Sequence, residues 1–165
     1  MKAALRKEFD IRYTTVLDGP SLTQWILALQ HWFPVSTDRE IDDACQCWIG
    51  FSRYSASLTA TLEGRPCGMA TLFLMPYRKV AHQALFKVIV SPEYQRQGIG
   101  TALIRNLKHL AKEYFRLKMI HTEIYENNPL EAILLSQGFS EYARQEKYVK
   151  QEGKYLARIL YEIAL

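Results

Sequence analysis

The sequence predicts a mixed α/β (α+β) fold, in which helices flank a central β-sheet. Several segments alternate apolar and polar residues, as half-buried strands do, while others repeat apolar residues every three or four positions, as amphipathic helices do. Along the chain these patterns give one strand, two helices, three strands, a helix, a strand, a helix and two strands. Strands and helices in this order build a sheet with helices on its faces. With 165 residues, the chain is expected to form a single domain over residues 1–165.

The N-terminal part is predicted to hold one strand and two helices. Apolar and polar residues alternate over Phe9–Tyr13, which suits a strand. Ser21 with Gln24, and Thr37 with Glu40, have the spacing of a capping box, in which two side chains satisfy free N–H groups at a helix start. The first helix is predicted to carry an apolar stripe made of Leu22, Trp25, Ile26, Leu29, Trp32 and Phe33.

The middle of the chain is predicted to form three strands and a long helix. Segments 58–62 and 68–75 read as strands around a turn at 63–66, and 84–90 reads as a mostly apolar strand. The helix after the third strand is predicted to bury one face. That face consists of Leu103, Ile104, Leu107, Leu110, Ala111, Tyr114 and Phe115.

The C-terminal part is predicted to add a strand, a short helix and a hairpin. Met119–Tyr125 suits a strand, and Asn128-Pro129 suits a helix start, because proline lacks an N–H that a first turn does not need. Gly138 is placed for a left-handed cap at the end of this helix. Segments 142–149 and 155–163 would then form the hairpin.

The loop that follows the third strand of the middle group is the most informative part of the chain. Gln95, Gly98 and Gly100 have the spacing Q-x-x-G-x-G and lie between an apolar strand and a periodic helix. Such a loop can direct backbone N–H groups at an anion, where the partial positive charge of the helix N-terminus adds to them. The pattern therefore predicts a pyrophosphate-binding loop, with a structural turn as the alternative.

Two common nucleotide-binding motifs do not fit this loop. The dinucleotide fingerprint needs a third glycine where Leu103 stands. The phosphate loop of nucleotide hydrolases needs lysine followed by serine or threonine, whereas Thr101-Ala102 follows here.

The loop resembles the acyl-CoA cradle of the GCN5-related N-acetyltransferases. A second segment supports the resemblance, because Glu126-Asn127-Asn128-Pro129 opens a short helix that ends at Gly138-Phe139, as in that family. The two segments cover about residues 84–140. The resemblance implies the acyl-CoA N-acyltransferase fold, with a splayed central sheet, and transfer of an acetyl group from acetyl-CoA to a primary amine of a small molecule or protein. The transfer would be direct, in a ternary complex.

The resemblance also implies which residues bind the co-substrate. Backbone groups of one central strand would hold the pantetheine arm and polarise the thioester carbonyl, the loop would hold the pyrophosphate, and an asparagine would face the cofactor. These residues are Val88, Ile89, Val90, Gln95, Arg96, Gln97, Gly98, Ile99, Gly100, Thr101 and Asn127. Asn128 is the structural alternative to Asn127, because an asparagine before proline is a good N-cap.

The expected catalytic groups are incomplete. Many relatives carry a tyrosine as general acid five residues before the phenylalanine of Gly-Phe, and Leu134 occupies that position here. The glutamate that many relatives carry before the loop is also absent. The remaining candidates are His82 and Tyr125, and an imidazole is suited to proton transfer near neutral pH. Tyr142 or Ser136 could replace the missing tyrosine, His121 lies on the facing strand, and a water chain could serve instead of a single base.

The acceptor is less well defined by the sequence. Aromatic and acidic residues of the N-terminal helices could bind a cationic amine, although tryptophans on helical stripes usually lie in the core. The residues in question are Trp25, Trp32, Trp48, Phe51, Tyr54, Asp38, Glu40, Asp42 and Asp43. A protein amine is an equal alternative. A catalytically degenerate acyl-CoA sensor or interaction module also remains open.

Composition limits the other functions. The net charge of +4 comes partly from a basic helix face, and no nucleic-acid-binding motif accompanies it, so nucleic acid is disfavoured as a partner. No apolar run is long enough to cross a membrane, and no signal peptide is expected. Three cysteines without framework spacing favour a reducing compartment, the cytoplasm, and no metal site is expected. A homodimer through the final hairpin or an exposed strand edge is compatible with the sequence.

Overall fold

A seven-stranded sheet organises the protein. The computed structural model describes residues 8–165. The strands are β1 (Phe9–Tyr13), β2 (Ser57–Leu62), β3 (Arg65–Leu74), β4 (Gln83–Val90), β5 (Met119–Tyr125), β6 (Ser140–Gln151) and β7 (Lys154–Ala164). They are arranged in the order β1-β2-β3-β4-β5-β7-β6, and among these seven strands only β4 and β5 pair in parallel. This mixed sheet with flanking helices confirms the predicted fold class.

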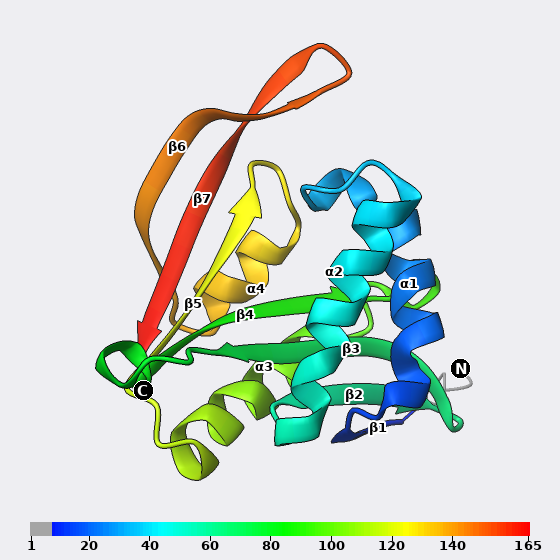
Figure 1. Ribbon diagram of the computed structural model, residues 1–165, viewed down its shortest axis with the longest axis vertical. Helices are drawn as coiled ribbons and strands as arrows, with labels where there is room; N and C mark the ends of the chain where they lie inside the picture. Colours follow the sequence, from blue (N-terminus) through cyan, green and yellow to red (C-terminus); the bar gives the residue numbers. More distant parts are fainter. Residues whose placement is uncertain (1–7) are drawn as a thin grey trace, which may run out of the picture.

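Two helices cover each face of the sheet (Figure 1). The helices α1 (Gly19–Ala28) and α2 (Asp38–Gly50) pack on one face, where their apolar stripes meet Met69 and Ile89. The helices α3 (Ile99–His109) and α4 (Leu130–Ser136) bury their apolar sides on the other face. Side chains of a strand alternate between the two faces, so β4 contributes Ile89 to the first core and Phe86 to the second.

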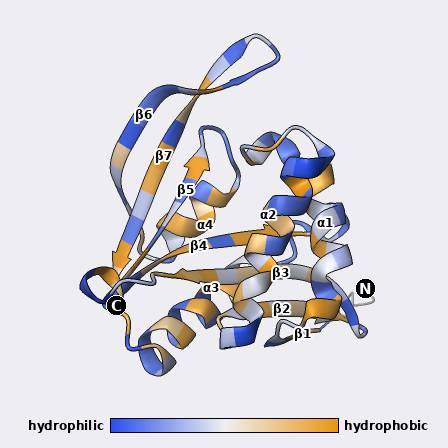
Figure 2. Ribbon diagram, in the orientation of Figure 1, coloured by the Kyte–Doolittle hydropathy of each residue, from blue (hydrophilic) through white to orange (hydrophobic). Residues whose placement is uncertain are grey.

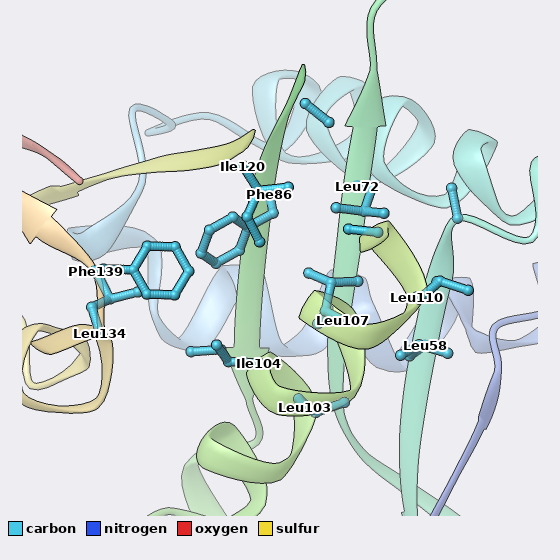
Figure 3. Packing of buried hydrophobic residues seen from close by; sticks show 14 of the residues in the cluster. Leu58, Leu72, Phe86, Leu103, Ile104, Leu107, Leu110, Ile120, Leu134 and Phe139 are labelled. Atoms are coloured by element: carbon cyan, nitrogen blue, oxygen red, sulfur yellow. The ribbon is translucent and has the colours of Figure 1, made fainter. Parts of the chain in front are cut away.

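The larger core lies under α3 and α4. Phe86 and Phe139 pack with their ring centroids 5.4 Å apart, and Leu134, Ile104 and Ile120 surround them (Figure 3). All five side chains are buried. Figure 2 shows that the central strands β3 and β4 are mainly hydrophobic, whereas β6, at the sheet edge, is mainly hydrophilic.

Two helices differ from their predicted bounds. The first begins at Gly19 rather than after Ser21, and it ends at Ala28, with a short 3-10 turn over Gln30–Trp32 in place of the last predicted turn. The helix α3 changes at Leu110 into a π-helical turn, Leu110–Tyr114. A π turn rotates the residues that follow it, and Tyr114, which we predicted to be buried, is exposed.

Other local predictions are confirmed. The Thr37 hydroxyl accepts a hydrogen bond from the Glu40 N–H, and the Glu40 carboxylate accepts one from the Thr37 N–H, which completes the capping box. Gly138 has the left-handed φ of +91° that ends α4. The hairpin β6–β7 turns at Glu152 and Gly153, which both have positive φ, and its tip projects beyond the rest of the molecule (Figure 1).

The strands β4 and β5 lie together at one end and diverge towards the other (Figure 1). They are paired only from Gln83 with Met119 to Leu85 with His121. One residue further along, the strands are joined by a side chain and no longer by backbone hydrogen bonds. The Thr122 hydroxyl donates a hydrogen bond to the carbonyl oxygen of Phe86 at 2.7 Å. Beyond this bond the sheet is splayed, as the family resemblance implies.

Candidate functional site

A cavity of about 500 Å³ lies where β4 and β5 have separated. Residues from the segment after α1, the end of β4, the glycine loop and the starts of α3 and α4 line it. These residues are Leu29, Trp32, Phe33, Val88, Ile89, Val90, Tyr94, Gln95, Arg96, Gly98, Ile99, Gly100, Thr101, Asn128, Pro129, Leu130 and Ile133. Its size suits an extended organic ligand rather than a single ion.

The start of α3 forms the end of this cavity that suits an anion. Gly98 precedes the helix with a φ of +83°, a conformation that residues with a Cβ rarely adopt. The first intrahelical bond is donated by the Ala102 N–H to the Gly98 carbonyl, so the N–H groups of Ile99, Gly100 and Thr101 have no acceptor within the helix. No side chain in residues 8–165 caps them. These N–H groups and the helix dipole together favour a phosphate group at this point.

The end of β4 provides backbone groups for the other part of a ligand. The Phe86 carbonyl points towards β5, because Thr122 reaches it. Alternate residues of a strand direct their N–H and C=O groups to the same side, so Val88 and Val90 direct theirs into the gap. Among the strands that the structure describes, none pairs with this edge beyond Leu85. A ligand chain lying in the gap can therefore hydrogen-bond to β4 as an added strand does.

Most residues predicted to bind the co-substrate line the cavity. The exceptions are Gln97, which is exposed in the loop, and Asn127, which has a left-handed φ of +68°. Asn128 lines the cavity instead, and its Oδ1 accepts a hydrogen bond from the Leu130 N–H at 3.0 Å. Of the two asparagines that the sequence offered, Asn128 is therefore the one that faces the cavity.

A smaller recess of about 40 Å³ continues from the cavity between the splayed strands. The two hollows share Trp32, Phe33, Val88, Asn128 and Leu130 as lining residues. The recess is also lined by Pro34, Lys87, Thr122, Glu123, Ile124 and Tyr125. The recess therefore opens to any ligand that reaches the end of β4.

The charged residues of the recess were not singled out from the sequence. Glu123 accepts a hydrogen bond from the Arg158 guanidinium at 2.6 Å, and Arg158 also lies over the Tyr148 ring. Lys87 lies on the same face of the sheet as Glu123. Leu85 pairs with His121, so their side chains share a face, and Lys87 and Glu123 each lie two residues further along the same two strands. Alternation within the two strands predicts this common face, but the sequence does not reveal that the strands flank a recess.

Tyr125 and His82, the two predicted catalytic residues, lie in different places. Tyr125 lines the recess, and burial raises the pKa of its hydroxyl to about 12, so it stays protonated near neutral pH. His82 is exposed and precedes β4, at the end where the strands are still paired. Six residues of extended chain separate it from Val88, a distance of about 20 Å. His82 therefore does not reach the cavity.

The position of the missing tyrosine, Leu134, and the candidates Ser136 and His121 also lie outside the cavity. Leu134 is fully buried beside Phe139, since α4 turns Leu130 and Ile133, not Leu134, towards the cavity. Ser136 donates to the Ile133 carbonyl within its own helix. His121 has a buried Nδ1 without a hydrogen-bond partner in residues 8–165, and burial lowers the pKa of its imidazole.

The acidic residues predicted to bind a cationic acceptor lie away from both hollows. Asp38, Glu40, Asp42 and Asp43 are exposed on α2 and line neither hollow, and Glu40 serves the capping box. The aromatic residues are also dispersed. Trp25 and Trp48 are buried in the core, whereas Trp32 lines both hollows.

Within residues 8–165, no helix is long and apolar enough to cross a bilayer, and no three His, Cys, Asp or Glu side chains gather as metal ligands would. Cys45, Cys47 and Cys67 are unpaired.

Comparison with known proteins identifies the family. The acetyltransferase (GNAT) family profile matches residues 21–139, which include both hollows. The chain belongs to the acetyltransferase (GNAT) family. Its seven-stranded mixed sheet with flanking helices matches the fold of that family's solved structures.

Individual relatives are distant. The L-amino acid N-acetyltransferase AaaT of Escherichia coli is 23% identical over 100 residues, which cover 60% of this chain and 62% of that protein. The matched part therefore spans less than two thirds of the relative. A ribosomal-protein-alanine N-acetyltransferase from Brucella melitensis has a similar structure, with a TM-score of 0.80, 23% identity and coverage of 94% and 99% of the two chains.

A phosphinothricin acetyltransferase from Sinorhizobium meliloti, solved in complex with acetyl-CoA, has a TM-score of 0.78 at 17% identity, with coverage of 95% of this chain and 88% of that one. At these identities the structures establish the shared fold.

Proposed function

We propose that this protein transfers an acetyl group from acetyl-CoA to a primary amine, directly within a ternary complex in one domain. One observation carries the proposal. A single cavity joins the uncapped N–H groups of α3, which suit a pyrophosphate, to the unpaired edge of β4, which suits a pantetheine arm. Relatives named for acetylation of amino acids and of a ribosomal protein support both small-molecule and protein acceptors.

The residues of the site have distinct parts in this reaction. Acetyl-CoA supplies an activated acetyl thioester. The Val88 N–H, which points into the gap, stabilises negative charge that develops on the carbonyl oxygen, because a fixed donor needs no reorganisation. The Glu123 carboxylate, which is paired with Arg158, can also accept a hydrogen bond from an amine in the recess. Tyr125 retains its hydroxyl proton at neutral pH and can donate a hydrogen bond.

Substitution of two matched glycines tests the cofactor site. Gly98 and Gly64 both have positive φ, +83° and +78°, and an added Cβ meets no atom within 4 Å at either position. Gly98→Trp and Gly64→Trp therefore carry similar backbone strain, but only Gly98 lines the cavity. At 100 times its dissociation constant, acetyl-CoA should stabilise the wild type and Gly64→Trp by about 2.7 kcal/mol in a thermal-shift titration.

Gly98→Trp should lose most of this stabilisation, since an indole would fill the loop. Equal stabilisation of the two folded variants, or none of the wild type, would overturn the proposed site. Release of CoA thiol with a panel of amines then measures transfer itself.

A second function, an acyl-CoA-binding sensor, is favoured by one observation. The position that often carries the general acid is Leu134, and it lies in the core. The sensor would bind acetyl-CoA with the same loop and release no thiol with any amine. The three unpaired cysteines support placing either function in the reducing cytoplasm.

A further inference from the structure

We propose that the acceptor is a small α-amino acid or a close analogue, whose carboxylate is bound by Lys87. This inference rests on the transferase function proposed above and specifies its acceptor. It follows from the charge, the size and the walls of the recess beside β4.

The Lys87 side chain lines the recess, and no carboxylate in residues 8–165 neutralises its positive charge. It is the one cationic side chain among the residues that line it. Its Nζ lies 5.3 Å from the centroid of the Phe73 ring, and no carboxylate in residues 8–165 lies within ion-pair distance of it. Lys87 is half-buried, so its charge is less screened than that of an exposed lysine. The ring contact orients the ammonium group without neutralising it.

The carboxylate of the recess is already paired. Glu123 binds Arg158 at 2.6 Å, and that guanidinium also contacts Gln145 and the Tyr148 ring. The nearby charges are therefore two cations and one anion, and the excess positive charge lies on Lys87. A cationic amine without an acidic group would leave this charge unmatched, whereas a zwitterion matches both Glu123 and Lys87. Such complementarity sets specificity more than total affinity.

The dimensions of the recess favour a small acceptor. Its volume of about 40 Å³, against about 500 Å³ for the cavity, suits a carboxylate group rather than a folded peptide segment. Trp32, Phe33 and Pro34 form its apolar wall. In the N-terminal residue of a protein the α-carboxylate is replaced by a peptide group, which has no charge for Lys87.

The test compares amino acids with their amides, which keep the amine and side chain but lack the carboxylate. Binding of L-leucine, L-leucinamide, L-phenylalanine and L-phenylalaninamide is measured by calorimetry, with and without saturating CoA. At about pH 6.5 the amines of all four are largely protonated, so the carboxylate is the difference within each pair. The variants are Lys87→Met, Lys87→Arg and Lys112→Met, the last being an exposed lysine that lines neither hollow.

At least one acid should bind wild-type protein tenfold or more tightly than its amide. Lys87→Met should reduce this preference for the acid over its amide to within about threefold, because the acid alone binds more weakly. Lys87→Arg should retain most of the preference, and Lys112→Met should leave it unchanged. Equal binding of each acid and its amide by the wild type, or an equal loss for both in Lys87→Met, would overturn the inference.

This test separates the acceptor inference from the proposed function. Because binding is measured without turnover, a preference for the acid combined with no thiol release would contradict the transferase and retain carboxylate recognition. Acetylation of acid and amide at equal kcat/KM would retain the transferase and overturn the role of Lys87.

Discussion

The hydrogen bond at the point where β4 and β5 separate should contribute measurably to stability. The Thr122 hydroxyl donates to the Phe86 carbonyl at 2.7 Å, and both residues are buried. Thr122→Val keeps the shape of the side chain but leaves this carbonyl without a partner. An unsatisfied buried group of this kind costs about 1–3 kcal/mol. We therefore expect the free energy of unfolding to fall by about 2 kcal/mol, and the Tm by roughly 4–8 °C for a chain of this length.

Urea denaturation with two control variants checks this magnitude. Thr122→Ser keeps the hydroxyl and removes one methyl group, so it should lose about 0.8 kcal/mol. Thr61→Val makes the same substitution at another buried strand position, where the hydroxyl makes no hydrogen bond within residues 8–165, and should be nearly neutral. If Thr122→Val is as stable as Thr61→Val at an unchanged m-value, the Thr122 bond does not hold the strands at this point.

Two further predictions concern pH and buried charge. Asp18 is 2% exposed and accepts hydrogen bonds from Arg12, Thr15 and Thr59, which lower the pKa of its carboxyl despite burial. In urea denaturation at pH 7, the free energy of unfolding of Asp18→Ala should be about 2–4 kcal/mol below that of the wild type, because hydrogen-bond donors are left unpaired. This difference between variant and wild type should become smaller as the pH falls below 3.8, since the carboxyl is then protonated. A difference that stays constant down to acid pH would contradict this role of Asp18. Burial lowers the pKa of His121 below 6.5, so the unfolded state binds the proton more readily and stability should fall as the pH drops through 6.5. His121→Gln should show a weaker pH dependence than the wild type between about pH 7.5 and 5, and parallel curves would show that the imidazole is not responsible.

Local sequence signals predicted much of the fold and the glycine loop that lines one end of the cavity. The Thr37 capping box and the Gly138 cap concern groups within a few residues of one another, so backbone geometry and hydrogen bonding decide them locally. The glycine loop is local in the same sense, because Gly98 and the first N–H groups of α3 are neighbours in the chain. For this reason the sequence alone identified the loop residues that line the cavity, except that Gln97, which was also named, does not line it.

Packing between distant segments overrode some local signals. The apolar stripe of α1 continues to Phe33, but the helix ends at Ala28, and Trp32 and Phe33 line the cavity instead. The spacing back from Phe139 located Leu134, but the sequence did not reveal that this side chain faces the core while Ile133 faces the cavity. Periodicity shows that a helix has an apolar side and does not show which neighbour covers it.

The sequence by itself determined the order of the elements, the family and the loop that suits a pyrophosphate, since each depends on residues close together in the chain. Only the tertiary structure decided which side chains surround the recess. Lys87, Glu123 and Arg158 come from β4, β5 and β7, and they gather because β4 and β5 pair over three residues and then separate. Strand alternation assigns each side chain to a face. The position at which two strands part depends on long-range packing and on the Thr122 bond, which no local pattern contains.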